Sequence, residues 1–180
     1  DEGSALSGAA NTQNSKKINM YNQMSQVLLG YTGSNNEVRK FELDMALDEV
    51  GECKAGWFIN LSRLITKDQI KKGSFKIQLG TASFKNNATW RNPFSASDGT
   101  SALVTITDAS ASDSGGTLNT FGGDYGVLYS DKLTTASIGP GMQAAAVGVI
   151  FYQAGVVFLS TGSFTGSLPD GTLAAPTNFY

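Results

Sequence analysis

The sequence predicts a mainly β fold, either a β-sandwich or a sheet, with one short N-terminal helix and long Gly/Ser-rich loops. Short runs of β-branched and aromatic residues recur along the chain between stretches rich in Gly, Ser, Thr and Asn. Charged residues make up only 16% of the 180 residues, and Gly occurs 21 times, which is typical of a β protein with many turns. Before the first of these runs, one segment has helical periodicity.

The strongest local signal is a hairpin in the last third of the chain. Two apolar runs, Val149–Tyr152 and Val156–Leu159, are joined by Gln153-Ala154-Gly155. Their β-branched and aromatic side chains favour strands that are buried on both faces. A three-residue connection that ends in Gly indicates a type I turn followed by a G1 bulge, in which Gly takes positive φ.

The predicted helix spans Lys17–Leu29, with Ser15 as its N-cap and Gly30 just after its end. Its apolar face consists of residues spaced three and four apart, which are Ile18, Tyr21, Met24 and Leu28. Residues 1–16 have no periodic apolar face and are expected to form an extended arm or linker ahead of a single β-rich domain, 17–180. Because the chain begins at Asp1 without Met, we expect it to be a processed or excised part of a longer polypeptide, or the ordered part of one.

Alternating or apolar runs predict the remaining strands. Two of them are candidate edge strands through which chains could pair, and these are Val38–Leu43 and Leu103–Thr107. The others are Ala55–Leu61, Phe75–Leu79 and Tyr125–Tyr129.

The composition removes several classes of function. With no histidine, the chain lacks the commonest general base, the Ser-His and Cys-His pairs and most zinc sites. A net charge of −2 argues against nucleic-acid binding, and no run is long and apolar enough for a membrane span. The single cysteine, Cys53, cannot form an intrachain disulfide, and we expect it half-buried in a strand rather than acting as a nucleophile. We expect no cofactor.

Two acidic segments offer weak alternatives. The run from 42 to 52 could supply the acid and the nucleophile of a glycan hydrolase, but a cluster on a polar turn is solvated and lacks the burial that raises a catalytic pKa. Its acids are Glu42, Asp44, Asp48, Glu49 and Glu52. The segment 108–113 loosely resembles a calcium loop, yet Asp113 stands where that loop needs Gly, so we favour a Ser-rich loop.

Loop aromatics are the candidate interaction residues. Trp90 and Phe94 flank Arg91-Asn92-Pro93 in a polar stretch, and Tyr31 follows the predicted helix. Such side chains line sugar platforms and also form hot spots of protein–protein contacts. Trp57 lies within a predicted strand, where we expect a core position.

Four stretches, in order along the chain, carry a resemblance: Trp57-Phe-Ile-Asn-Leu-Ser-Arg-Leu64, Lys67-Asp-Gln-Ile-Lys-Lys-Gly-Ser-Phe75, Tyr125-Gly-Val-Leu-Tyr-Ser130 and Gly148-Val-Ile-Phe-Tyr-Gln-Ala-Gly-Val-Val157. They resemble structural proteins of marine contractile-tailed bacteriophages, especially cyanophages, over about residues 19–164. The resemblance implies a virion component of the tail, neck or baseplate type, assembled in the host cytoplasm, and brings no catalytic residues with it.

These observations lead to one expectation and two alternatives. We expect a non-enzymatic structural or assembly subunit of a phage particle, a homo-oligomer that also contacts other virion proteins and acts through self-association and strand or arm exchange. The first alternative is a glycan- or receptor-binding module of a phage fibre or adhesin. The second is a carboxylate-dependent glycan hydrolase.

Overall fold

The fold is a curled antiparallel β-sheet with one helix, which confirms the predicted mainly β class and selects a sheet over a sandwich. The structure, a computed structural model, describes residues 2–4, 12–32, 36–42, 45–47, 52–53, 55–65, 68–80, 103–109, 117–131 and 146–160. The elements are β1 (Glu2–Ser4), α1 (Thr12–Leu28), β2 (Ala55–Asn60), the 3-10 turn η1 (Ser62–Leu64), β3 (Lys76–Gly80), β4 (Leu103–Thr107), β5 (Thr117–Thr120), β6 (Gly123–Ser130), β7 (Ala146–Phe151) and β8 (Val156–Ser160).

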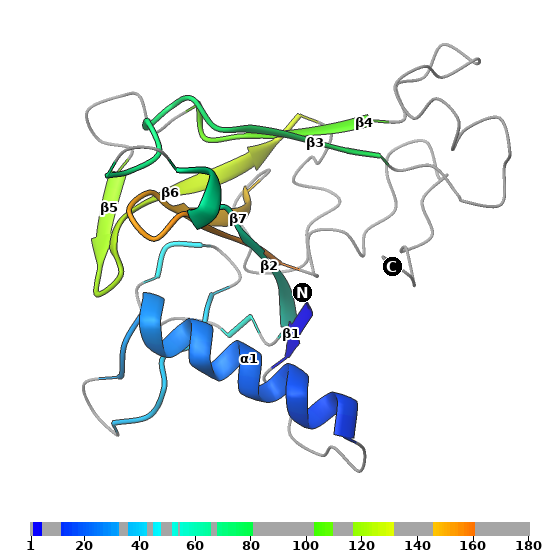
Figure 1. The fold of residues 1–180 in the computed structure, drawn as a ribbon, viewed down its shortest axis with the longest axis vertical. Helices are drawn as coiled ribbons and strands as arrows, with labels where there is room; N and C mark the ends of the chain where they lie inside the picture. The colour runs from blue at the N-terminus through cyan, green and yellow to red at the C-terminus, as the bar shows by residue number, and fades with distance from the viewer. Residues whose placement is uncertain are drawn as a thin grey trace, which may run out of the picture.

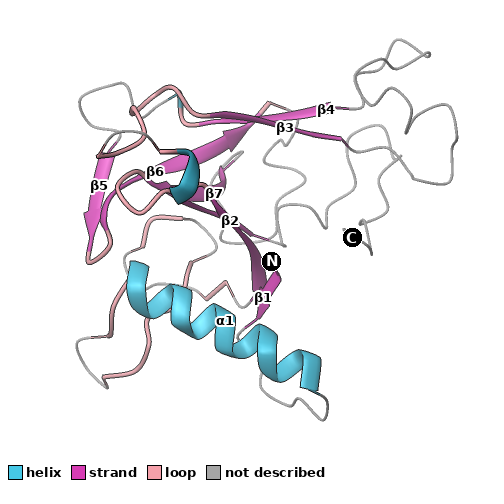
Figure 2. Ribbon diagram, in the orientation of Figure 1, coloured by secondary structure: helices cyan, strands magenta, loops and turns pink. Residues whose placement is uncertain are grey.

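The strands follow the order β1-β2-β8-β7-β6-β4-β3, and β5 pairs with the first half of β6. Every pairing is antiparallel. Figure 1 shows β3 and β4 side by side at one end of the sheet, whereas α1 lies beside β1 at the other. In Figure 2, pink connecting segments fill the layer between this helix and the strands.

The predicted hairpin is β7 and β8, at the centre of the sheet, and every residue of both strands is buried. Gly155 has φ +65°, as predicted, because the turn needs a left-handed residue before β8. The connection is one residue longer than predicted, since Tyr152 belongs to the turn and the Gly155 N–H donates to the Phe151 carbonyl at 2.9 Å.

Both faces of this hairpin are covered by apolar side chains. One cluster, which includes Phe41, Phe58 and Phe158, faces α1 and the loop that follows it. The other, which includes Ile106, Ile150 and Val157, faces the opposite side. The prediction of strands buried on both faces is therefore confirmed.

A β-bulge at Val147 changes the face of the sheet toward which the first side chains of β7 point. Leu128 pairs with Gly148 while Tyr129 pairs with Ala146, so Val147 is the extra residue on β7. Because side chains alternate along a strand, one inserted residue reverses the alternation beyond it. Val147 accordingly packs in the second cluster although Val149, two residues on, packs in the first.

The helix starts earlier than predicted. It begins at Thr12, so Ser15 lies within the first turn and is not the N-cap. Its predicted apolar face is confirmed at Tyr21 and Leu28, which are fully buried, and Gly30 follows its end with φ +80°. Residues 1–16 were expected to form an arm, but Glu2–Ser4 form β1 on this chain's own β2 and the helix takes up residues 12–16.

Both predicted edge strands need correction. Leu103–Thr107 is β4, an internal strand between β6 and β3. Residues 38–42 form no ladder and make only two isolated bridges, Tyr31 with Val38 and Phe41 with Cys53, because they run in the layer between α1 and the sheet. The edge at that end of the described sheet is β3.

Candidate functional site

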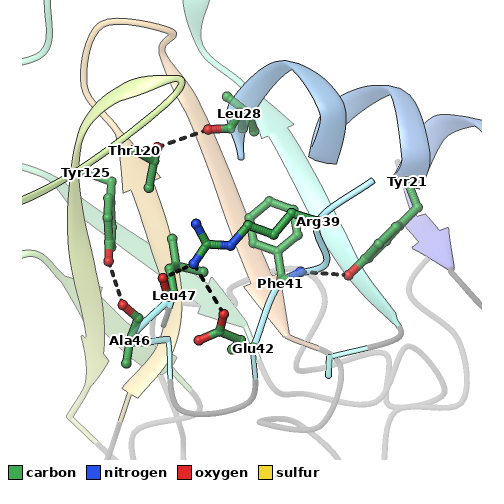
Figure 3. Close-up of polar contacts among 9 residues, drawn as sticks. All are labelled: Tyr21, Leu28, Arg39, Phe41, Glu42, Ala46, Leu47, Thr120 and Tyr125. Atoms are coloured by element: carbon green, nitrogen blue, oxygen red, sulfur yellow. Dashed lines mark hydrogen bonds and ion pairs between the residues drawn. The ribbon is translucent and has the colours of Figure 1, made fainter. Parts of the chain in front are cut away.

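The layer between α1 and the sheet is held by buried polar contacts (Figure 3). The Tyr21 hydroxyl accepts the Phe41 N–H at 3.1 Å and donates to the Cys53 carbonyl. From the sheet, the Tyr125 hydroxyl donates to the Ala46 carbonyl at 2.8 Å. These bonds satisfy backbone groups that have no ladder partner, so they fix the described residues 36–42 and 45–47 in place.

An ion pair lies in the same layer. The Arg39 guanidinium is 3.6 Å from the carboxylate of Glu42, whose side chain is 2% exposed, and it also donates to the Leu47 carbonyl. Leu47 itself has φ +56°, a costly left-handed conformation for this residue type. The hydrogen bond from Arg39 to the Leu47 carbonyl stabilises the loop in that conformation.

The acidic run was expected to be solvated, and this expectation is wrong at Glu42, which is buried. Of its members, Glu42 and Glu52 are described, and the second is paired with Lys40 at 3.0 Å on the surface. The other three, Asp44, Asp48 and Glu49, lie outside the described residues. Each described carboxylate of the run thus has a basic side chain beside it.

A second buried carboxylate lies below the β7–β8 turn. Asp108 accepts the N–H groups of Gly73 and Phe75, each at 2.8 Å, and the hydroxyl of Tyr152 at 2.9 Å. Burial, and then the hydrogen bond to Asp108, raise the pKa of Tyr152. Lys72 lies over the Tyr152 ring and pairs with Asp124. Asp108 is thus a buried anchor for the segment that leads into β3, whereas residues 110–113 of the segment compared with a calcium loop lie outside the described residues.

Within the part of the chain that the structure describes, β3 is an edge strand, and every second residue of it turns its backbone groups away from β4. Thr105 of β4 bonds through its N–H and its carbonyl to Asp131, on the β6 side. By alternation, Val104 and Ile106 bond to Leu79 and Ile77 on the other side. The N–H and C=O groups of Lys76, Gln78 and Gly80 therefore point away from β4, at the edge of the described sheet.

A hollow of about 390 Å³ adjoins the start of β3. Apolar and polar residues both line it, and these are Leu61, Leu64, Ile65, Gln69, Ile70, Ser74, Phe75 and Lys76. Leu64 is 76% exposed at its rim. An exposed leucine beside an open strand edge is a combination that protein contacts use.

A separate apolar patch surrounds the end of α1. The β5–β6 turn is tied there, because the Leu28 carbonyl accepts both the Gly122 N–H at 2.8 Å and the Thr120 hydroxyl at 2.9 Å. Phe121, in the same turn, lies against Gly30 yet is 83% exposed. We call Val27, Tyr31 and Phe121, which are all exposed, the helix-end patch.

The predicted interaction residues are only partly described. Tyr31 is exposed, as an interaction residue must be, whereas Trp90 and Phe94 lie outside the described residues. Trp57 is half-buried on β2 and packs against the second cluster, so the expected core position holds in part. Sequence reasoning missed Leu64 and Phe121, although Phe121 is a lone large apolar residue in a polar turn.

Cys53 is more deeply buried than expected and lies in an isolated bridge with Phe41. Its thiol is 3.2 Å from the Ser160 hydroxyl, and burial raises its pKa, which disfavours the nucleophilic thiolate. Among the described residues, no three Cys, Asp or Glu side chains gather as a metal site would require. In the same residues, α1 is too short and too polar to cross a membrane.

Comparison with known proteins gives no relative. The chain matches no family model, no curated protein and no solved structure.

Proposed function

We propose that this chain is a non-enzymatic structural subunit of a contractile-tailed phage particle, and that it acts by binding to copies of itself. The observation that carries the proposal is the edge of β3 in the described sheet, where three alternate residues turn their backbone groups away from β4 beside a hollow. Sheet edges of this kind bind by adding a strand from another chain. The resemblance to phage structural proteins is the reason why we propose a phage particle as the assembly that these copies build.

Two features of the surface support association over catalysis. The described residues expose large apolar side chains at two places, Leu64 beside β3 and the helix-end patch. Their best-buried carboxylates, those of Glu42 and Asp108, are engaged by Arg39 and by hydrogen-bond donors and serve as structural anchors. Apolar contacts that recur in every copy are what a particle built of many copies needs.

The N-terminal strand offers a second route to assembly. β1 contributes only three residues to the ladder, at the end of the sheet opposite β3. The same pairing with β2 can form within one chain or between two, because exchanged elements make identical contacts. Exchange of β1 would therefore link two copies through contacts that already exist within one chain.

Sedimentation velocity over a concentration series tests the proposal. We expect the mass to rise above the 18.9 kDa of one chain, with regular objects in electron micrographs of the concentrated sample. Leu64→Ser should weaken association without loss of fold, whereas the matched change at its exposed neighbour, Arg63→Ser, should not. A chain that stays monomeric at every concentration would refute the proposal.

The glycan-binding alternative keeps one supporting observation, the exposure of Tyr31 within the helix-end patch. Aromatic side chains on a surface can stack against sugar rings. A monomer that binds on a glycan array, and loses that binding in Tyr31→Ala, would establish this alternative in place of assembly.

A further inference from the structure

We infer that β3 of one copy pairs antiparallel with β3 of a second copy, with the two-fold axis midway between the two copies of Gln78. The inference rests on the proposed function, since it names the contact by which two copies join. It depends on one juxtaposition: the outward-facing backbone units at Lys76, Gln78 and Gly80 are spaced symmetrically about Gln78.

The backbone groups match in this arrangement. In an antiparallel pair, directly opposed residues alternate between those that exchange two hydrogen bonds and those that exchange none. With Gln78 opposite its own copy, Lys76 faces Gly80 of the second copy, and all three opposed pairs consist of outward-facing residues. The remaining pairs join Ile77 to Leu79, whose backbone groups already bond to β4.

The length of β3 selects this register over its neighbours. Centring on Gln78 pairs all five residues of the strand with the second copy. A shift of two residues in either direction keeps the hydrogen-bond parity but leaves only three of the five paired within β3. The largest shift toward the start of β3 would also place Lys76 opposite Lys76, and like charges directly opposed destabilise a sheet.

The side chains agree with the same register. Ile77 and Leu79 are half-buried and pack against the second apolar cluster, so their cross-strand contact would continue that cluster into the second copy. Lys76 and Gln78 are exposed on the other face, where the lysine would face a glycine. Apolar side chains thus meet on one face, and no like charges are opposed on the other.

The hollow beside β3 would enlarge this contact. Five backbone pairs alone bury less area than a stable interface requires. Lys76 lines the hollow and is also the first residue of β3, so the second copy would lie against the exposed Leu64 and the half-buried Phe75. We therefore expect a dimer that dissociates on dilution.

Cross-linking tests the register directly. In Gln78→Cys, the two introduced thiols would face each other at the axis, and mild oxidation should yield a covalent dimer within the range of Cα separations that a disulfide spans. Asn119→Cys, on an exposed position of β5, is the matched control and should give no covalent dimer under the same oxidation. Cys53 is buried and should not react.

Proline substitution tests the hydrogen bonds. Gln78→Pro removes an N–H that points away from β4, so the fold keeps its own ladder. The two bonds at the axis are lost, and self-association should weaken about ten-fold or more. Gln78→Thr keeps the N–H and should associate as the wild type does.

The outcomes separate this inference from the proposed function. A covalent dimer of Gln78→Cys, together with weakened association of Gln78→Pro, supports the pairing. Oligomers that persist unchanged in Gln78→Pro, with no more cross-linking in Gln78→Cys than in the Asn119→Cys control, overturn the pairing but leave assembly standing. A wild-type chain that never associates overturns both.

Discussion

At the scale of single residues, Tyr21 joins the helix to the loop that covers the sheet. Its side chain is fully buried, its hydroxyl bridges Phe41 and Cys53, and its ring makes edge contacts with Phe41, Phe58 and Phe158. The burial of the Tyr21 ring is predictable from the helical periodicity of the sequence. The hydrogen-bond partners of its hydroxyl are not predictable in this way, because they are backbone groups distant from Tyr21 in sequence.

Tyr21→Phe should keep the ring packing and remove both hydrogen bonds. The buried Phe41 N–H would then lack its partner, so we expect a loss of about 1–3 kcal/mol in the free energy of unfolding. Urea denaturation measures it. Tyr31→Phe, at a half-exposed position, is the control and should change stability by less than about 0.5 kcal/mol. Equal losses in the two variants would contradict this role for Tyr21.

The same variant should alter the response to alkaline pH. Burial raises the pKa of Tyr21 above its ordinary value near 10, so the folded state holds the phenolic proton more tightly than the unfolded state. The stabilisation is complete below pH 10 and declines as pH rises above that value. The wild type should therefore lose stability more steeply above pH 10 than Tyr21→Phe, by up to about 1.4 kcal/mol per pH unit. Parallel pH profiles would contradict the assignment.

Gly126 is required for a steric reason. A Cβ atom there would overlap the Tyr152 hydroxyl, which is held by Asp108. Gly126→Ala should therefore displace the phenol and cost about 1–3 kcal/mol of stability. In a Tyr152→Phe background the added penalty should shrink, and a double-mutant cycle in urea measures that coupling. Additive losses would show that the glycine matters for another reason.

At the scale of elements, the loop residues 36–42 and 45–47 depend on a buried ion pair. Glu42→Gln leaves the Arg39 guanidinium without its charged partner in a nearly buried place, and we expect a loss of about 3 kcal/mol. The surface pair of Lys40 and Glu52 is the matched comparison, and Glu52→Gln should cost less than about 1 kcal/mol. Chemical denaturation should show a larger loss of stability in Glu42→Gln than in Glu52→Gln. The reverse order would contradict a structural role for the pair of Arg39 and Glu42.

Elements with strong local patterns were predictable, and those shaped by distant partners were not. The β7–β8 hairpin and the left-handed Gly155 follow from apolar runs and turn chemistry. Residues 38–42 have the composition of a strand, yet Tyr21 and the sheet hold them as a loop. No local pattern reveals that β4 is internal, because strand order depends on which strands pair over long sequence distances.

At the scale of the molecule, the central strands of the sheet have a partner strand on each side, whereas β3 has one on one side only within the described residues. The candidate site was predictable only in kind. The loop aromatics indicated residues for surface contacts, and Tyr31 proved exposed, but the positions of the edge and of Leu64 could be found only from the fold. Self-association through β3 is the claim on which the proposed function depends.

Amide hydrogen exchange, resolved to single residues and measured at low and high protein concentration, tests that claim most directly. The amides of Ile77 and Leu79 bond to β4 and should be protected at both concentrations. Those of Lys76, Gln78 and Gly80 point outward and should exchange fast when dilute and become protected when concentrated. Fast exchange of these three amides in a sample whose mass shows association would contradict assembly through β3.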